Sequence, residues 1–509
     1  MTHSKVSTGE EVLRTDVVVV GSGPAGLSAA AAATEAGRRV VVVDLAPRTG
    51  GQYWRHAAEA EGEDPRPRGH HDWGVYLGLR ARCERAERTG RLTRLQGTQV
   101  WSAEPHPGGE HVLRLSPTPE LLHGSHAPAG TPDVVLAPTV ILCTGAYDRQ
   151  LPVPGWELPG VMAAGGVQAF IKVNGRSPGR RAVVAGTGPF LLSVAAGILA
   201  AGGEVAAVCE SSSLTGWAPH LGAAAAVPSK GREGLEYAAA LLRHRVPYRT
   251  RTVVTRILGE DRASGVRIAS VDSRGRVRPG TERVVEDVDV VGLGWGFTPQ
   301  LELPVALGVD TRVDVDGSLV GITDQHQRSS VPGVFLAGEV TGVGGAALAV
   351  AEGTIAGAVA AGATAPVRAL RTRRAHRRFA ASMHAAHPVP SQWAQWLTPE
   401  TLVCRCEEVA SGTLARATTT LGAEDSRSVK GTTRVGMGWC QGRVCGFAST
   451  CLSAGGGEDQ IHRSLLASAK RPMAAPVALG RLAALDDRRD PLPLPETPAF
   501  THPIPEETL

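Results

Sequence analysis

The chain has 509 residues, 42% of them hydrophobic and 20% charged, which is a globular composition, and the length favours roughly two to four domains over one core. Its formal net charge is +4, so neither nucleic acid nor an anionic membrane surface is expected as the main partner. Residues 1–13 contain no apolar signal core, and no run reaches the roughly 18 apolar residues of a membrane span.

The first elements predicted along the chain form a βαβ unit. The run 16–20 predicts a buried strand, the glycine-rich turn 21–26 follows it, and an alanine-rich helix extends to Gly37. A second strand over 39–43 then ends at Asp44. This order is typical of the opening of a dinucleotide-binding domain.

Each glycine of this turn has its own task. Gly21 permits the tight turn, Gly23 lets the backbone approach a pyrophosphate, and Gly26 lets the helix and the strand pack closely. The helix N-terminus supplies free N–H groups, and the carboxylate of Asp44 can accept hydrogen bonds from a ribose hydroxyl. The alternative, a glycine-rich turn without a ligand, is disfavoured because strand, helix, second strand and acid all fall in place.

A second cycle of the same kind is predicted after a small antiparallel layer over 91–136 and a buried strand over 138–145. Its first strand, 181–185, leads into the turn 186–189, and its second strand ends at Glu210. The repeated order predicts a second dinucleotide-binding domain.

The second turn departs from the full motif. Glu210 suits a free ribose 2′-OH and disfavours NADP, but Leu191 stands where the third glycine would be. The residues leave two alternatives open. Either NAD or another adenine nucleotide binds at Gly186, Gly188 and Glu210, or the site is an empty remnant.

A later strand, 331–338, is followed by a Gly/Ala-rich helix over 344–360. In two-dinucleotide flavoproteins, a segment such as Gly338-Glu339 closes over the ribityl chain. The N-terminus of the next helix, near Ala346, then points at the flavin and stabilises negative charge on it. FAD is therefore favoured over NAD for the first site.

Residues 366–400 predict a helix followed by a linker. The arginines within 371–378 are interpreted as a solvated helix face or a subunit contact. The pair His70-His71, and also His384 and His387, have no convergent acid or cysteine partners in the sequence. We interpret these histidines as solvated.

Four cysteines near the C-terminus have the spacing of a cluster site, with C-x-C at 404–406 and C-x₄-C at 440–445. Four thiolates are the usual complement of a [2Fe–2S] cluster, and the long chain lacks the features of a secreted disulfide framework. Zinc is the alternative, but structural zinc sites favour longer spacings than C-x-C. Cys404, Cys406, Cys440 and Cys445 are therefore predicted to bind [2Fe–2S] in a cytoplasmic protein.

Several segments, in this order, resemble a known group of flavoproteins: GSGPAG (21–26), GGQYWR (50–55), 140–161, AGTGP (185–189) and 337–357. They are similar to two-dinucleotide flavoproteins related to glutathione reductase. More closely, they resemble the α or A subunits of multimeric amine and amino-acid dehydrogenases. That group includes opine oxidase, D-proline and hydroxyproline dehydrogenases and the B component of hydrogen cyanide synthase. The cysteine segment resembles the bacterioferritin-associated-ferredoxin-like [2Fe–2S] module.

The resemblance implies an α/β fold with two Rossmann-like dinucleotide-binding domains and a small helical [2Fe–2S] domain. The implied limits are 14–178 and 286–365 for the FAD domain, 179–285 for the second dinucleotide domain, 366–400 for the helix and linker, 401–455 for the cluster domain and 456–509 for an extended tail. The implied FAD-binding residues are Gly21, Gly23, Pro24, Ala25, Gly26, Asp44, Gly51, Gln52, Thr144, Gly145, Gly338, Glu339, Ala346 and Ala347.

The function implied by the resemblance is electron transfer within a hetero-oligomer. A partner β subunit with its own flavin would oxidise the C–N bond of an amine or amino acid, such as an opine, D-proline, hydroxyproline, glycine or sarcosine. No acid/base catalyst is assigned in this chain. Residues 45–60 and 211–400 contain no cysteine, so a disulfide reductase is not expected. Two alternatives are a stand-alone NADH-dependent reductase and a non-enzymatic iron-handling or docking protein.

Overall fold

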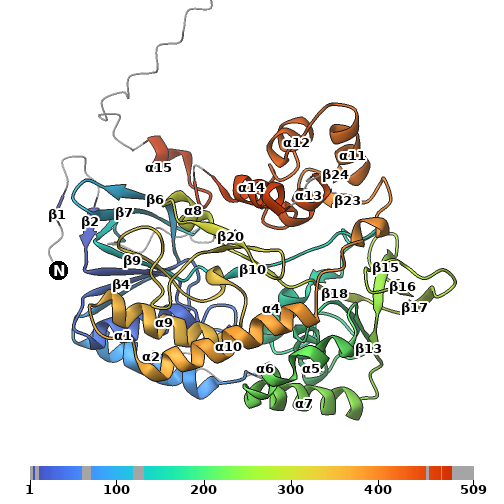
Figure 1. Ribbon diagram of the computed structural model, residues 1–509, viewed down its shortest axis with the longest axis horizontal. Helices are drawn as coiled ribbons and strands as arrows, with labels where there is room; N and C mark the ends of the chain where they lie inside the picture. The colour runs from blue at the N-terminus through green and yellow to red at the C-terminus, as the bar shows by residue number, and fades with distance from the viewer. Residues whose placement is uncertain are drawn as a thin grey trace, which may run out of the picture.

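The computed structural model describes residues 4–5, 11–59, 70–118, 131–453, 458–471 and 473–483. They form two parallel sheets with their helices, an antiparallel layer and a small helical module at one edge (Figure 1). The predicted α/β class is confirmed.

The first sheet is parallel and carries the first glycine-rich turn. Four of its strands consist mainly of valine, leucine and isoleucine and are buried along most of their length, as expected where both faces of a parallel sheet are covered, whereas the edge strand β5 (Leu92–Gln96) is more polar and half-buried. In spatial order they are β22 (Val334–Leu336), β9 (Thr139–Leu142), β3 (Val17–Val20), β4 (Val40–Asp44) and β5 (Leu92–Gln96).

Helices α1 (Pro24–Glu35) and α9 (Ala346–Ala360) pack against each other beside this sheet. Their contact is made of small residues. A Cβ on Gly353 would lie 2.0 Å from the carbonyl oxygen of Ala25, and one on Gly357 would lie 2.1 Å from that of Ala29. Alanine and glycine therefore let the two backbones touch, which fixes the N-terminus of α9 relative to the first turn.

Two further helices, α2 (Trp73–Arg88) and α10 (Val367–Ala386), lie on the same side as α1 and α9 (Figure 1). The opposite layer is a sheet of mostly antiparallel strands. In spatial order these are β1 (Ser4–Lys5), β2 (Glu11–Arg14), β8 (Val134–Ala137), β7 (Glu110–Pro117) and β6 (Thr98–His106).

The second parallel sheet carries the second glycine-rich turn. Its strands in spatial order are β11 (Val161–Ala163), β18 (Val290–Gly294), β12 (Arg181–Gly186), β13 (Glu204–Glu210) and β14 (Tyr248–Thr250). The helices of this half are α4 (Ala164–Asn174), α5 (Phe190–Ala200), α6 (Leu221–Ala225) and α7 (Pro228–Arg243), and η1 (Leu214–His220) is a 3₁₀ turn.

The chain passes between the two sheets through a short ribbon in which β10 (Ala146–Asp148) pairs antiparallel with β19 (Phe297–Pro299). Strands β11 and β18 lie beyond this ribbon and hydrogen-bond within the second sheet. Both fall inside the ranges predicted for the FAD domain. The limits 178/179 and 285/286 therefore do not coincide with the boundary between the sheets, because the crossing point is set by the β10–β19 pairing.

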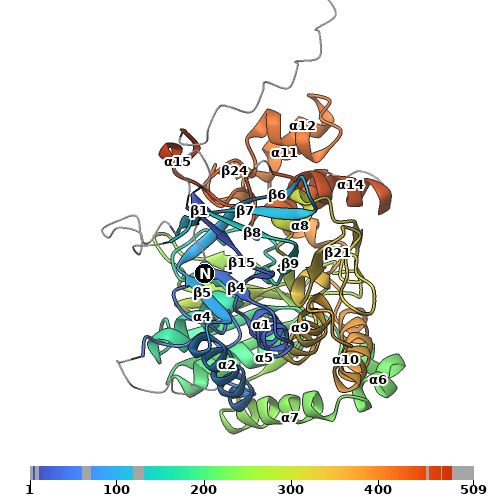
Figure 2. The same cartoon turned by 90° about the vertical axis from the view of Figure 1, so that its left-hand side faces the viewer.

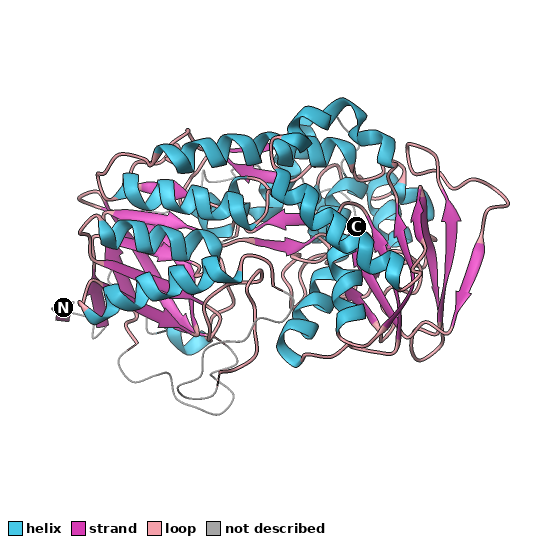
Figure 3. Cartoon of the chain, turned by 90° about the horizontal axis from the view of Figure 1, so that it is seen from below, coloured by secondary structure: helices cyan, strands magenta, loops and turns pink. Residues whose placement is uncertain are grey.

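Smaller elements surround the two sheets. A three-stranded antiparallel sheet lies at the end of the molecule far from the N-terminus (Figure 3). It consists of β15 (Thr252–Leu258), β16 (Gly265–Ser270) and β17 (Arg283–Glu286). The remaining elements of the main body are α8 (Glu302–Ala306), the hairpin β20 (Thr311–Val313) with β21 (Leu319–Gly321), and the 3₁₀ turns η2 (Glu339–Thr341) and η3 (Trp393–Trp396).

The cysteines lie in a module of short elements. It comprises β23 (Leu402–Cys404), β24 (Val409–Ala410), α11 (Ser411–Thr419), α12 (Ser426–Thr433), α13 (Gly446–Ser453) and α14 (Glu458–Ala469). Figures 1 and 2 both place it at the opposite edge of the molecule from α6 and α7.

The prediction of an extended tail from residue 456 is wrong for its first part. Helix α14 packs on α12 and α13, and Ile461, Leu465 and Leu466 face a shared apolar core. The proline-rich composition lies further along the chain and does not reach this segment. A short helix, α15 (Leu479–Ala483), follows, and residues 484–509 lie outside the described residues. No helix in the described ranges is both long and apolar enough to cross a bilayer.

Candidate cofactor sites

The first turn is shaped so that only glycine fits at two of its positions. A Cβ on Gly21, where φ is +99°, would lie 2.4 Å from the carbonyl oxygen of Cys143. A Cβ on Gly26 would lie 1.7 Å from the carbonyl oxygen of Gly21. A Cβ on Gly23 would have the Cα of Gly51 as its nearest neighbour, at 3.8 Å. The gap above Gly23 and the free N–H groups at the start of α1 form a cradle that suits a pyrophosphate.

Asp44 stands at the end of β4 beside this cradle. Its Oδ2 accepts hydrogen bonds from the backbone N–H and the hydroxyl of Ser22, and its Oδ1 accepts one of 2.7 Å from the N–H of Ala46. Burial raises the pKa of Asp44, and these hydrogen bonds oppose the rise. The carboxylate is thus fixed at the edge of the turn, where a ribose hydroxyl would meet it.

The segment predicted to close over the ribityl chain lies against the first turn, although it is distant in sequence. A Cβ on Gly338 would lie 3.0 Å from the Cβ of Ala25. The carboxylate of Glu339 accepts hydrogen bonds from the N–H groups of Gly344 at 3.0 Å and Gly345 at 2.9 Å. Ala346 and Ala347 form the first turn of α9 directly after them.

Three other predicted residues lie on nearby loops. The hydroxyl of Thr144 donates a 2.8 Å hydrogen bond to the carbonyl of Gln300, and the N–H of Gln300 donates one of 3.0 Å to the carbonyl of Gly145. These bonds hold the start of the β10–β19 ribbon. The side chain of Gln52 accepts a hydrogen bond of 3.0 Å from Nε of Arg55 and is exposed.

Lys172 is a functional candidate that the sequence analysis missed, although a single lysine in an otherwise apolar helix was a signal for it. It is 7% exposed and lies on α4, and its Nζ donates a 2.6 Å hydrogen bond to the carbonyl of Tyr53. It therefore ties a helix of the second half to the loop of the first site. Burial, with a smaller contribution from Arg55, lowers the pKa of Lys172 to about 8.

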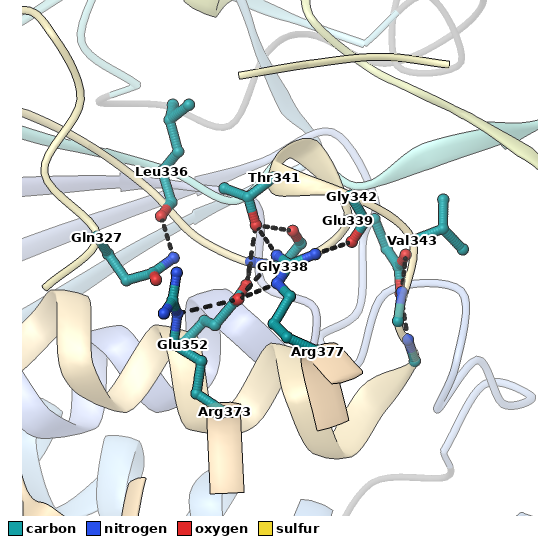
Figure 4. Close-up of polar contacts among 12 residues, drawn as sticks. Gln327, Leu336, Gly338, Glu339, Thr341, Gly342, Val343, Glu352, Arg373 and Arg377 are labelled. Carbon is teal, nitrogen blue, oxygen red and sulfur yellow. Dashed lines mark hydrogen bonds and ion pairs between the residues drawn. The ribbon is translucent and has the colours of Figure 1, made fainter. Parts of the chain in front are cut away.

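Figure 4 shows a network of charged side chains next to Gly338, centred on a buried carboxylate. The carboxylate of Glu352, which is fully buried in α9, accepts hydrogen bonds of 3.0 Å from the N–H of Gly338 and from the hydroxyl of Thr341. Its other oxygen lies 2.7 Å from Nη2 of Arg377 and 3.5 Å from Nε of Arg373. The network clamps the Gly338 loop to α10.

The interpretation of residues 371–378 as a solvated face is therefore wrong for Arg373 and Arg377, although Arg371, Arg374 and Arg378 are exposed. A sequence signal existed. Glu352 is the only charged residue in the helix AALAVAEGTIAGAVA, and such a residue in an apolar helix needs a partner.

The second turn is similar in shape to the first, but a different kind of segment lies against it. A Cβ on Gly186 would lie 1.7 Å from the carbonyl oxygen of Gly294. Glu210 is fully buried, and its oxygens accept hydrogen bonds from the N–H of Gly188 and the N–H of Ser212, both at 2.8 Å, and from the Thr187 hydroxyl at 3.1 Å. Like Asp44, this acid is fixed against its own turn.

His387 lies beside this turn and is buried, so its interpretation as a solvated residue is wrong. It is 8% exposed, its Nδ1 lies 3.4 Å from Oε2 of Glu210, and its Nε2 accepts a 2.8 Å hydrogen bond from Nε1 of Trp217. A Cβ on Gly188 would have the Cβ of His387 as its nearest neighbour, at 4.0 Å. The partners come from separate elements, which the sequence could not reveal.

The structure brings the four module cysteines together. The thiol of Cys445 shares hydrogen bonds with the sulfurs of Cys404 and Cys440, and Cys440 shares one with Cys406. Mainly through Cys445, the pKa of Cys404 falls to about 6 and that of Cys440 to about 4, while the pKa of Cys445 itself rises. The pKa of Cys406 also rises, so two of the four sulfurs, those of Cys404 and Cys440, are favoured as thiolates.

The backbone around these cysteines also suits sulfur ligands. Gly436 donates its N–H to the sulfur of Cys404, and Gly442 donates its N–H to that of Cys440. A Cβ on Gly438 would lie 2.3 Å from the Cβ of Cys406. The described residues include no group of three His, Cys, Asp or Glu side chains arranged for one metal ion. A two-iron cluster instead takes two thiolates on each iron.

Known proteins of similar sequence and structure identify the family of the chain. The family model described as pyridine nucleotide-disulphide oxidoreductase matches residues 15–365. The A subunit of opine oxidase from Rhizobium meliloti (strain 1021) is 33% identical over 92% of this chain and 98% of its own length. The HcnB subunit of hydrogen cyanide synthase from Pseudomonas aeruginosa is 30% identical over 87% of this chain and 94% of its own.

The crystal structure of L-proline dehydrogenase from P. horikoshii has a TM-score of 0.59 at 17% identity, covers 93% of this chain and 80% of its own, and supports the fold. These findings confirm the predicted resemblance and an FAD-dependent oxidoreductase. The chain belongs to the pyridine nucleotide-disulphide oxidoreductase family and, within it, to the group that contains the opine oxidase A subunits.

Proposed function

We propose that this chain is the electron-transfer subunit of a hetero-oligomeric amine or amino-acid dehydrogenase and that it carries both FAD and a [2Fe–2S] cluster. The observation that carries the proposal is the presence in one chain of a glycine cradle with its fixed acid and of four cysteines linked by hydrogen bonds between their sulfurs. A relative that is named as part of an oxidase aligns over 92% of the chain.

The residues of the first site would each hold one part of FAD. The N-terminus of α1 and the gap above Gly23 would bind the pyrophosphate, and Asp44 would orient the ribose. Gly338-Glu339 would line the ribityl chain, and the N-terminus of α9 would favour negative charge on the flavin. Bound FAD supplies chemistry with electron pairs.

Cys404, Cys406, Cys440 and Cys445 would be the cluster ligands. Two of these thiols already have lowered pKa values, and backbone N–H groups point at their sulfurs. Such hydrogen bonds set the reduction potential of an iron–sulfur centre. A bound [2Fe–2S] cluster supplies transfer of single electrons.

The catalytic partner would be a flavin-dependent β subunit of the oxidase type that oxidises an opine, D-proline, hydroxyproline, glycine or sarcosine-like substrate. We assign no acid or base catalyst to this chain, and we place the complex in the cytoplasm. The stand-alone NADH reductase is disfavoured by the contact of His387 with Glu210 beside Gly188. The non-enzymatic alternative does not account for the cradle.

A test begins with anaerobic purification of the whole chain, followed by a visible spectrum and assays of iron and acid-labile sulfide. We expect one FAD and one cluster per chain. Cys440→Ser should lose the cluster and keep FAD. Cys451→Ser is the matched control, because Cys451 lies outside the quartet and burial raises its pKa to about 11. A colourless wild-type protein without iron would contradict the proposal.

The amine activity needs the partner. Co-expression with an adjacently encoded flavin-dependent oxidase, followed by a screen of amines and amino acids, should give substrate-dependent bleaching of the complex. Reduction of the isolated chain by NADH at a comparable rate would favour the reductase alternative instead.

A further inference from the structure

Arg443 lies inside the C-x₄-C loop, between Cys440 and Cys445, and its side chain leaves the module. Its Nε donates a 2.7 Å hydrogen bond to the hydroxyl of Tyr147, and its Nη2 donates one of 2.6 Å to the carbonyl of Ala474. The side chain is 17% exposed. The loop that holds two of the four cysteines is therefore anchored to the main body.

The anchor point belongs to the flavin side of the molecule. Tyr147 is on β10, which continues directly from the predicted FAD residues Thr144 and Gly145. Its hydroxyl lies 3.2 Å from Oε1 of Glu302, at the start of α8. Arg443 thus joins the cysteine loop to the ribbon next to the first site.

The charges at this junction do not cancel. Oε1 of Glu302 lies 3.1 Å from Nε of Arg443 and 3.4 Å from Nη1 of Arg471, so two guanidinium groups share one carboxylate. The carboxylate is 6% exposed, and its Oε2 has no hydrogen-bond partner among the described residues. Electrostatic interactions link both arginines to Cys440. The two arginines and Glu302 together therefore carry one net positive charge near Cys440, in a poorly solvated position.

We propose that Arg443 is a positioning residue for the [2Fe–2S] cluster, which anchors the 440–445 loop on the flavin-side ribbon and supplies a fixed positive charge that raises the cluster's reduction potential. The inference rests on the proposed function. Reduction adds one negative charge to a cluster, and net charge near an iron–sulfur centre is one of the quantities that set its potential. A guanidinium in a poorly solvated site interacts more strongly with that charge than an exposed one does.

The test is a redox titration of the cluster in the purified whole chain, followed by electron paramagnetic resonance. Arg443→Gln should shift the one-electron equilibrium about tenfold toward the oxidised cluster, which is ~59 mV for one electron. Arg443→Lys should restore most of the shift because it keeps the charge. Glu302→Gln should move the potential in the opposite direction, because it removes the negative charge of the junction.

Arg434→Gln is the matched control. Arg434 is another arginine of the module, but it is 67% exposed, is not among the proposed site residues and pairs with Glu407 at 2.8 Å. Its replacement should leave the potential unchanged. If Arg443→Gln fails to retain the cluster, Glu302→Gln still shows in which direction the charge of the junction shifts the reduction potential, because that variant keeps both arginines.

Two results would overturn the inference: an unchanged potential in Arg443→Gln, or a downward shift in Glu302→Gln. Failure of the proposed function looks different, since the wild-type chain would then contain no iron or acid-labile sulfide to titrate.

Discussion

In the first glycine-rich turn, Gly23 faces Gly51 across a gap, whereas in the second turn Gly188 faces the side chain of His387. Both turns follow a buried strand, both forbid a Cβ at their first glycine, and both are touched by an acid from the end of the next strand. They differ at the third glycine, Gly26, where the second half has Leu191. The local motif sets the shape of a turn, and the segment opposite determines what lies next to its second glycine.

The largest effect is expected from adding a side chain at the third glycine of the first turn, the position where the second turn has Leu191. Gly26→Ala places a Cβ 1.7 Å from the carbonyl oxygen of Gly21, and backbone cannot give way as a flexible side chain would. We expect loss of bound FAD and poor folding, measured as the FAD-to-protein ratio and the yield of soluble chain. Gly78→Ala on α2 is the control, since its Cβ would meet nothing within 4 Å. Normal FAD content in Gly26→Ala would show that the turn does not hold FAD.

The loop opposite the first turn is held by the Glu352 network. Glu352→Ala leaves Arg373 and Arg377 without their buried partner and frees the N–H of Gly338. Breaking a buried ion pair in this way costs about 3–5 kcal/mol. Denaturant unfolding should show this loss together with weaker FAD retention. Arg374→Ala, an exposed arginine on the same helix, should change stability by less than about 0.5 kcal/mol, and an equal loss there would contradict the role of the clamp.

Lys172 joins the two halves and gives a pH-dependent prediction. Burial lowers its pKa from the ordinary 10.5 to about 8, so the folded chain releases this proton before the unfolded chain does. Between these values the unfolded state binds more protons, and stability therefore rises with pH in that window. At lower pH both states are protonated, and the full penalty of about 3 kcal/mol applies.

The measurement is the free energy of unfolding of the wild type relative to Lys172→Met, at pH 7.5 and pH 10. From pH 7.5 to pH 10, the free energy of unfolding of the wild type should rise by about 2–3 kcal/mol relative to that of the variant. Lys470→Met, at an exposed position, should show no such gain. A constant difference for Lys172→Met would mean that the lysine is solvated in the folded chain.

The parts of this comparison that follow from local sequence could be predicted, and the parts that depend on packing could not. The strand–turn–helix order, the roles of Gly21 and Gly26 and the acid after each second strand repeat over short distances, so the sequence reveals them. The cysteine spacing predicted a quartet that the fold brings together. The assignment of individual residues to FAD and to the cluster stays a prediction.

Contacts between distant segments were not predictable in the same way. The pairs Glu210 with His387, Glu352 with Arg377, and Tyr147 with Arg443 arise because α10 and the cysteine loop cross the dinucleotide domains. Composition also gave a wrong prediction for α14, because the extended structure expected for the proline-rich end was assigned to a segment that has an apolar stripe. A buried charge in an apolar helix, as at Glu352 or Lys172, is the one sequence signal that could have indicated such partners.

The smallest predicted effect tests whether His387 obstructs the second turn. His387→Ala removes the ring that lies against Glu210 and above Gly188, while Gly186, Gly188 and Glu210 keep their places. If the turn retains nucleotide affinity, NADH or ATP should bind about tenfold more tightly to the variant, a gain of ~1.4 kcal/mol. Isothermal titration of each nucleotide measures the change. His244→Ala, an exposed histidine in the same half, should bind as the wild type does. Absence of binding in both variants would assign the second turn to an empty remnant, because removing the obstacle would then have uncovered no site.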